Sequence, residues 1–433
     1  MSKRQPISGS LAQRLFVVAM SAVPAFGDDI ATAVDLPTAA ERKKAALKLA
    51  KQYTVTDLLP RMREFGAFRQ REPEVHTFSV KLRVGRRDEK TDLHVYTPRG
   101  YSPKQRWPML MAFHGTGQSG RIALMEWIVI AQNNGLVLVA PSESGANTGY
   151  RFSERERAAA LAAIRYCRRA WNIDENRIFV AGSSRGAHLA WDLALRHPGR
   201  YAGLVAAIGC PRINTAKGQN NMRYLENVAM LPIRDLQGSR DNPWMVSNLR
   251  FAFKRLESFG AKDAEFIEFP NRGHGYDLRK VEGDLFRKTR VPVPQRVVRA
   301  YARRGEGRAH WIEVLSADAT VKEQFRIVAK ASRVKGVDDE TYKRFLQEEA
   351  DKRTARLEVS SDGENRFVAK GLRVRRFRLL LTREMFNPER PVEVVFNGKT
   401  FRRKVVPDAG VLAQEFVERF DRTFLPVAEV RVP

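Results

Sequence analysis

The residues best suited to chemistry lie around Ser184, the middle of a Gly-x-Ser-x-Gly pattern at 182–186. Its glycines permit a turn so tight that a Cβ would collide with the adjoining strand or helix, and such a turn exposes the serine hydroxyl. Apolar residues at 178–181 precede the pattern, and helix-forming residues follow it. This context predicts a nucleophile elbow, because the pentapeptide alone arises readily by chance. The alternative is a structural turn in which the serine is incidental.

A serine hydroxyl is a weak nucleophile unless a base takes its proton. His274 is the best candidate for that base, since it lies between two glycines just after an apolar run. Asp241 follows another apolar run in a glycine-containing loop, and its carboxylate would orient the imidazole. The alternative for Asp241 is an ordinary surface-loop residue. Together the three residues predict acyl transfer by a Ser-Asp-His triad.

A tetrahedral intermediate also needs two backbone N–H donors for its oxyanion. We expect one from Arg185, the residue after the nucleophile. The other would come from the glycine-rich loop 114–120, most simply from the amide of Thr116, with His114 shaping the loop.

The same loop invites a rival interpretation, because a glycine-rich turn after a strand can cradle phosphates. Arg121 and Ile122 stand where a phosphate-binding loop needs a lysine and a hydroxyl side chain. The pattern therefore argues against a nucleotide site. No metal-ligand spacing occurs in the sequence, so neither a metal nor a cofactor is expected.

Five residues are expected to line the substrate pocket, on their position in loops and helix starts alone. They are Glu126, Trp127, Tyr150, Arg151 and Phe152.

Apolar runs that alternate with helical segments would position these residues. Period-two segments at 76–82 and 93–96 predict an antiparallel hairpin. Apolar-rich runs predict buried strands at 108–113, 136–140, 178–181, 204–208, 232–236 and 265–269, with helices near 122–134, 153–171, 187–196 and 245–258. This alternation indicates βαβ units, and hence an α/β fold with a doubly wound, mostly parallel sheet.

The regions on either side of this pattern differ from it. We expect an N-terminal helical segment at 28–75, with helices at 39–51 and 56–65, before a catalytic domain at 76–290 and a linker at 291–309. A smaller β-sandwich-like domain is expected at 310–433, where Asn397-Gly398 indicates a hairpin. Its expected strands are 310–316, 323–333, 355–360, 366–370, 374–382, 391–397, 400–406 and 426–432, with helices around 337–350 and 410–420.

The first 27 residues have the features of a signal peptide, with basic residues before an apolar stretch at 15–24 and small residues at 25 and 27. A buried helix is the alternative. We expect a secreted or periplasmic protein with no membrane span, because no later run reaches transmembrane length. Cys167 and Cys210 are expected to be two separate buried thiols, although this compartment permits a bridge.

The formal charge of +27 is spread over 433 residues of which 43% are apolar. No block of Lys and Arg stands apart, so no specific nucleic-acid binding is expected. The charge favours contact with an acidic polymer or the cell-envelope surface, or it is a solvated cationic surface.

Residues 75–290 resemble the α/β-hydrolase superfamily, specifically secreted bacterial esterases related to polyhydroxybutyrate depolymerases and feruloyl esterases, and prolyl-oligopeptidase-like hydrolases. The resemblance is carried by residues 113–117, 174–178, 182–186, 238–241 and 273–275. The β-rich extension with its hairpin at 391–398 is similar to that of one sub-group. Arg185-Gly186-Ala187 departs from the usual Met-Gly-Gly, and the Arg185 side chain would either bind an acidic substrate group or point away.

The leading hypothesis is a secreted serine esterase that cleaves small or polymeric carboxylic esters through an acyl-enzyme. A peptidase on the same scaffold is a second hypothesis, because a fold does not select the leaving group. The third is a non-catalytic protein that binds a polymer or polysaccharide.

Overall fold

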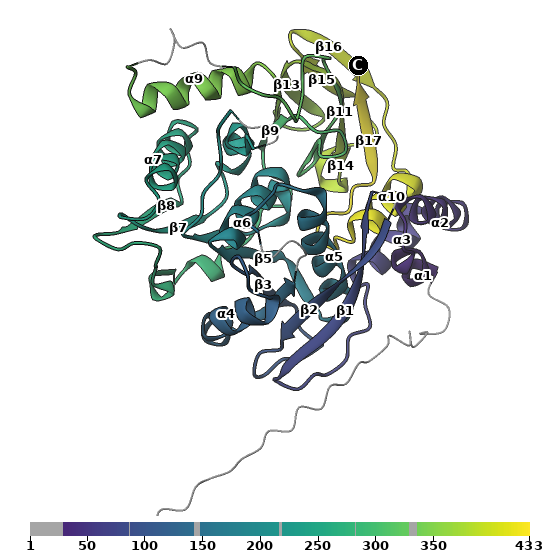
Figure 1. The fold of residues 1–433 in the computed structure, drawn as a ribbon. Coiled ribbons are helices and arrows are strands. Elements are labelled where there is room, and N and C mark those ends of the chain that lie inside the picture. Colours follow the sequence, from purple (N-terminus) through teal and green to yellow (C-terminus); the bar gives the residue numbers. More distant parts are fainter. Residues whose placement is uncertain (1–28, 86, 143–147, 216–218, 282, 329–335) are drawn as a thin grey trace, which may run out of the picture.

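The computed structural model describes residues 29–85, 87–142, 148–215, 219–281, 283–328 and 336–433 (Figure 1). The expected signal peptide at 1–27 lies outside these residues. In the part of the chain that the model describes, no helix is both long and apolar enough to cross a bilayer.

An eight-stranded sheet forms the centre of the first domain, with the strand order β1-β2-β4-β3-β5-β6-β7-β8. The first two strands pair antiparallel, β2 joins β4 antiparallel, and every other pair is parallel. The strands are β1 Val75–Val84, β2 Arg87–Tyr96, β3 Trp107–Phe113, β4 Val137–Ser142, β5 Ile173–Ser183, β6 Gly203–Ala207, β7 Ile233–Gly238 and β8 Ala264–Phe269. The predicted α/β-hydrolase fold class, with a mostly parallel sheet and a further β-rich domain, is confirmed.

Helices cover both faces of the sheet, which is why the inner strands β3, β4 and β6 are largely apolar. On β3, Met109 and Met111 enter one core, with α5 Glu154–Ala170 and α6 Arg185–Arg196. Leu110 enters the opposite core, under α4 Gly120–Asn134. The helix α7 Pro243–Ser258 lies against β8. Alternate side chains of one strand therefore serve two cores.

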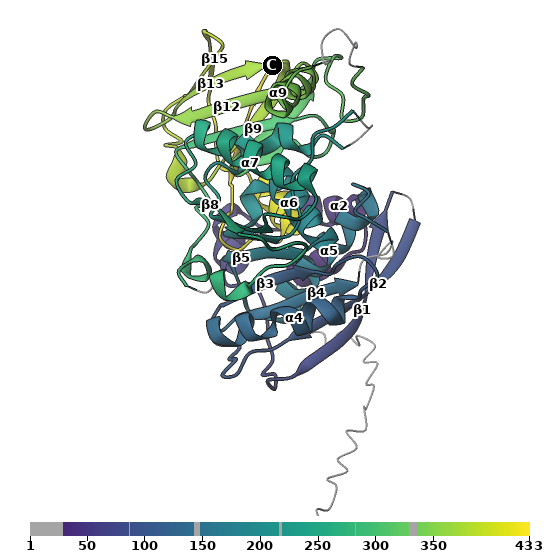
Figure 2. The same ribbon diagram turned by 60° about the vertical axis from the view of Figure 1, so that its left-hand side comes forward.

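The second domain is a β-sandwich of a four-stranded sheet, β10-β11-β14-β17, and a five-stranded sheet, β16-β15-β13-β12-β9 (Figure 2). Both contribute to one apolar core. The strands are β9 Arg296–Tyr301, β10 Arg308–Ala309, β11 Ile312–Ala317, β12 Ala355–Ser361, β13 Arg366–Leu372, β14 Val374–Leu381, β15 Val392–Phe396, β16 Lys399–Arg403 and β17 Ala428–Val432. Asn397 and Gly398 connect β15 to β16 with φ of 46° and 83°, as the predicted two-residue hairpin requires.

Two expectations for this domain are wrong. The segment 291–309 is not only a linker, because β9 pairs with β12 along its full length and buries Val297 in the sandwich core. Residues 323–328 form no strand; Phe325 and Ile327 pack instead on the core of the first domain. The rest of that expected strand, 329–333, lies outside the described residues.

Three N-terminal helices, rather than the expected two, precede the sheet: α1 Asp29–Asp35, α2 Ala39–Gln52 and α3 Val55–Arg63. Thr38 and Glu41 form a capping box at the start of α2. These helices pack on α10 Ala409–Arg419, near the other end of the chain, and share the sandwich core (Figure 1). The expected insertion is α9 Asp339–Asp351, which packs on α7.

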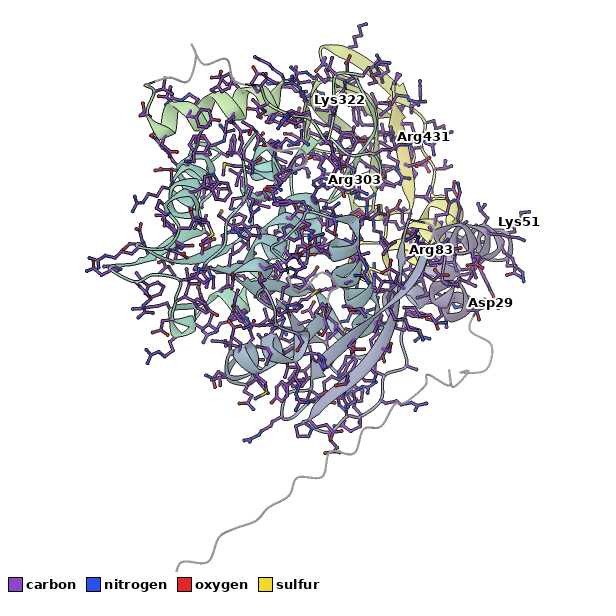
Figure 3. The ribbon with its side chains drawn as sticks, viewed as in Figure 1. Asp29, Lys51, Arg83, Arg303, Lys322 and Arg431 are labelled. Carbon is purple, nitrogen blue, oxygen red and sulfur yellow. The ribbon has the colours of Figure 1, made fainter. Side chains whose placement is uncertain are left out.

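Short 3-10 helices complete the described elements: η1 Pro198–Arg200, η2 Asn221–Val228, η3 Leu278–Val281, η4 Leu285–Arg287 and η5 Arg383–Met385. Basic side chains lie on many elements, as Lys51 on α2, Arg83 on β1 and Arg431 on β17 illustrate (Figure 3). Cys167 and Cys210 are both buried free thiols.

Candidate active site

The turn at Ser184 joins β5 to α6 with φ of 54° and ψ of −115°, a strained conformation for a residue with a side chain. The flanking glycines make this turn possible. A Cβ on Gly182 would lie 2.3 Å from the carbonyl carbon of Gly186, and one on Gly186 would lie 2.2 Å from the oxygen of Phe113. A third glycine, Gly209, also packs closely against this turn, since a Cβ on it would lie 2.6 Å from the carbonyl oxygen of Ser184. The elbow predicted from the sequence is therefore present.

Ser184, His274 and Asp241 form a continuous hydrogen-bonded line. The Oγ of Ser184 lies 3.1 Å from Nε2 of His274, and Nδ1 of that ring lies 2.9 Å from Oδ2 of Asp241. A proton on Nδ1, shared with the carboxylate, leaves Nε2 as the acceptor for the serine hydroxyl. The His274 side chain is 50% exposed, whereas that of Asp241 is only 7% exposed. The geometry suits a base that substrate can reach and a sheltered carboxylate that orients it.

Backbone and side-chain donors hold Asp241 in place between β7 and α7. Gln237, buried near the end of β7, donates from Nε2 to Oδ2 over 2.7 Å, and the amide of Asn242 donates to Oδ1 over 2.7 Å. The preceding Gly238 brings this loop against the loop of His274, because a Cβ there would lie 2.0 Å from the oxygen of Gly273. The two loops that present the acid and the base thus touch through a glycine.

A cluster of polar side chains holds Ser183, the residue that precedes Ser184 at the elbow. Glu126 on α4 accepts hydrogen bonds from the hydroxyls of Ser183 and Tyr276, and the Tyr276 hydroxyl also lies 3.0 Å from Oγ of Ser183. Burial raises the pKa of the Glu126 carboxyl, although both hydrogen bonds lower it. The cluster therefore links Ser183, next to the nucleophile, to Tyr276, close to the base His274.

The amides expected to hold an oxyanion flank this line. β3 pairs with β5 so that Phe113 lies opposite Gly182, which brings the loop containing Thr116 beside the elbow. Thr116 is exposed there, and the amide of Arg185 belongs to the first turn of α6, where N–H groups have no acceptor within the helix. The Arg185 guanidinium is buried and donates to Glu156 over 2.7 Å, so of the two expected orientations it takes the one that points away from substrate.

Not all of the expected pocket residues reach the site. Trp127 is fully buried beneath the sheet, and Tyr150 is buried with its hydroxyl donating to Asp192 over 2.7 Å. For these two the expectation is wrong, because each side chain is part of the core. Phe152 is also largely buried, Arg151 is exposed, and Glu126 belongs to the polar cluster beside Ser183.

Arg212 and Trp244 were not foreseen from the sequence. The Arg212 guanidinium lies 5.5 Å from the ring centroids of both Phe152 and Trp244, so two loops and the start of α7 meet there. Burial lowers the pKa of Arg212, and Nε of that residue has no hydrogen-bond partner among the described residues. Burial, and then the charge of Arg212, lower the pKa of the neighbouring His188 to about 3, so His188 is neutral at ordinary pH. An aromatic-flanked cation at this position suits an anionic or polar substrate group.

Comparison with known proteins adds likenesses of low similarity. No family model matches the sequence, and neither does any curated protein. Among solved structures, a thermostable esterase is 20% identical over 49% of this chain and 63% of its own, with a TM-score of 0.42. Esterase 2 of Thermogutta terrifontis is 18% identical over 48% of this chain and 86% of its own, with a TM-score of 0.39. A putative dipeptidyl aminopeptidase IV from Bacteroides ovatus is 16% identical over 50% and 34%, with a TM-score of 0.39.

The chain spans less than two thirds of the length of the first of these structures. Because sequence identity and TM-score are low, the evidence for a function comes from the geometry of the site. In the described part of the chain, no group of three or more His, Cys, Asp or Glu side chains is arranged to hold a metal ion.

Proposed function

We propose that this protein is a serine hydrolase that cleaves carboxylic esters through an acyl-enzyme intermediate. The observation that carries the proposal is the line from Ser184 through His274 to Asp241, with hydrogen bonds of 3.1 Å and 2.9 Å. The strained elbow supports it, because a residue with φ of 54° persists only where its surroundings hold it.

In the proposed reaction, Ser184 Oγ attacks the ester carbonyl carbon while Nε2 of His274 takes the hydroxyl proton. The negative charge that develops on the carbonyl oxygen would be held by the amides of Thr116 and Arg185. Collapse of the intermediate releases the alcohol, which receives its proton from His274. Water then attacks the acyl carbon while His274 takes a proton from it. Collapse breaks the bond to Ser184, whose Oγ receives that proton, and releases the carboxylic acid; Asp241 stabilises the imidazolium in both stages.

Esters are favoured over peptides because the extra domain is a β-sandwich of two sheets, not the propeller that limits entry in oligopeptidases. The test uses short p-nitrophenyl esters and aminoacyl nitroanilides in parallel. We expect turnover of the esters only; turnover of the anilides alone would move the assignment to a peptidase.

A fluorophosphonate probe tests the nucleophile directly. We expect labelling of the wild type and of Ser183→Ala, and none of Ser184→Ala, because the hydroxyl of Ser184, and not that of Ser183, lies beside His274. Ser183→Ala is the matched control, since the neighbouring hydroxyl is engaged by Glu126 and Tyr276. A folded wild-type protein that resists the probe would favour a non-catalytic binding role.

We also propose that the protein is exported, on the composition of residues 1–27, and that its positive charge favours acidic polymers or the cell envelope. Fractionation of cells that express the chain with and without residues 1–27 tests the first point.

A further inference from the structure

A cavity of about 50 Å³ lies between the two domains, away from Ser184. From the first domain it is lined by α5, by the start of β5 and by η1; from the second, by β10 and the end of α10. α5 and α10 are neighbours there, since Arg168 donates to the carbonyl oxygen of Arg419 over 3.3 Å (Figure 1). The charged side chains in its wall are Arg168, Arg200, Arg290, Arg308, Arg419, Glu175 and Asp421.

Positive charge exceeds negative charge in this wall, with five arginines against two carboxylates. The carboxylates already have close partners. Asp421 lies 2.9 Å from Arg290, and Glu175 lies 2.6 Å from Arg422, which is outside the cavity. Arg290 is satisfied further by the oxygen of Gly199 at 2.6 Å.

Arg308 lies 3.3 Å from Glu415, a carboxylate outside the cavity wall. Arg168 and Arg200 lack such close partners among the described residues. Arg168 is 4% exposed, and its Nε and one terminal nitrogen have no hydrogen-bond partner among the described residues. Its nearest carboxylate oxygens are 3.8 Å and 4.0 Å away. Arg200 forms no ion pair within 4.0 Å in the described part of the chain, and its buried Nε has no hydrogen-bond partner there.

Burial of unpaired cations is costly, and the pKa values reflect it. Burial and then the charge of Arg419 lower the pKa of Arg200 to about 9. Burial also lowers the pKa of Arg308, although the charge of Glu415 opposes that shift. Arginine does not escape such a site by losing its proton, because its intrinsic pKa is too high. An anion in the cavity would supply the missing charge and hydrogen-bond acceptors.

The volume indicates the size of that anion. A cavity needs about 10–15 Å³ to hold one water, so this one holds about three to five water-sized groups. A tetrahedral oxyanion has four oxygens, each of which accepts hydrogen bonds from guanidinium groups.

We propose that this cavity binds a small tetrahedral oxyanion, phosphate or sulfate, which joins the hydrolase domain to the β-sandwich through Arg168, Arg200 and Arg419. The anion bridges cations from both domains. It therefore stabilises their mutual packing and takes no part in the reaction at Ser184.

Thermal unfolding and calorimetric titration of the full chain test the proposal, with sodium phosphate and sodium sulfate in separate arms and sodium chloride at equal ionic strength as reference. We expect a saturable rise in Tm of about 3 °C at a hundred times the dissociation constant, and one bound anion per chain. The arm with the tighter titration identifies the ion. Equal stabilisation by all three salts, or no titratable site, would overturn the proposal.

Two variants locate the effect. Arg200→Met should abolish the anion-dependent rise in Tm, yet without oxyanion should be as stable as the wild type or more so, because it removes a half-buried charge that has no ion pair among the described residues. The control is Arg375→Met, an exposed arginine whose nearest carboxylate is 3.9 Å away, and it should keep the full rise. If Arg200→Met keeps that rise, the anion binds elsewhere. Arg168→Met provides a second, independent test in the same cavity.

Discussion

Gly238→Ala should slow the reaction although Gly238 contributes no side chain to the hydrogen-bonded line. The new Cβ would lie 2.0 Å from the oxygen of Gly273, and Cβ contacts under 3.0 Å essentially never occur. The neighbours are backbone, so one loop must move by about 1 Å. This movement separates the Asp241 loop from the His274 loop.

A displacement of about 1 Å at a reacting group costs about a hundredfold in rate. We therefore expect kcat for p-nitrophenyl acetate to fall about a hundredfold, with a loss of about 1–3 kcal/mol in the free energy of unfolding from the overcrowded contact. Steady-state kinetics and urea unfolding of the same preparation measure the two effects.

The matched control is Gly275→Ala, on the other side of His274. Its Cβ would meet only the flexible side chain of Arg272, at 3.4 Å, and its φ is not positive. This variant should keep kcat within about threefold of the wild type. The reasoning fails if folded Gly238→Ala keeps full activity, or if both variants lose activity equally.

Further outcomes follow from the same contacts. Asp241→Asn should lower kcat by about 10³–10⁴-fold at neutral pH. The NH₂ group of the new amide would face a donor in either orientation: the N–H of Asn242 in one, and Gln237 with His274 in the other. Retained activity would remove Asp241 from the mechanism. Arg212→Met should lower the kcat/KM ratio of a hemisuccinate ester to a butyrate ester about tenfold, through loss of a charge-assisted hydrogen bond, and an unchanged ratio would exclude contact with the acyl chain. Burial raises the folded pKa of Glu126, so the stability that this carboxyl contributes is present below its unfolded pKa near 4.5 and is lost as pH rises through the folded pKa. In urea unfolding, Glu126→Gln should therefore be more stable relative to the wild type at pH 8 than at pH 5. The opposite trend would contradict this. Burial raises the pKa of Asp192, but the charges of Arg196 and Arg157 outweigh burial and lower this pKa to about 2. About 2 kcal/mol of the free energy of unfolding, present above pH 3.8, should therefore be lost as pH falls towards 2. In Asp192→Asn the free energy of unfolding should depend less on pH in this range.

Apolar patterning located all eight strands of the central sheet. Period-two alternation indicated β1 and β2, and apolar-rich runs indicated the others, because strands covered on both faces are mostly apolar. The same signal failed for β9, where Arg296 and Arg299 interrupt the pattern although Val297 is buried. An arginine whose guanidinium reaches a polar partner is easily mistaken for a surface residue. Local sequence therefore gives buried apolar strands more clearly than mixed ones.

At the site, chain order and loop glycines were enough to select Ser184, Asp241 and His274, which the structure brings together. The position of a residue in a loop or helix start does not indicate where its side chain points. Trp127 was therefore predicted to line the pocket although its side chain is buried in the core. The spacing of Ala123, Leu124, Trp127 and Ala131 on one face of α4 could have indicated burial. No local pattern could have found Arg212, because the aromatic rings beside it come from a distant loop and from the start of α7.

The packing of α2 and α3 on α10 ties residues from opposite ends of the chain into one core. During synthesis, residues 39–63 must therefore wait for residues 409–419 before their apolar faces are covered. Until then these helices would offer a binding surface to a chaperone or to the export machinery, and a chain that stops before residue 409 would leave that surface open permanently.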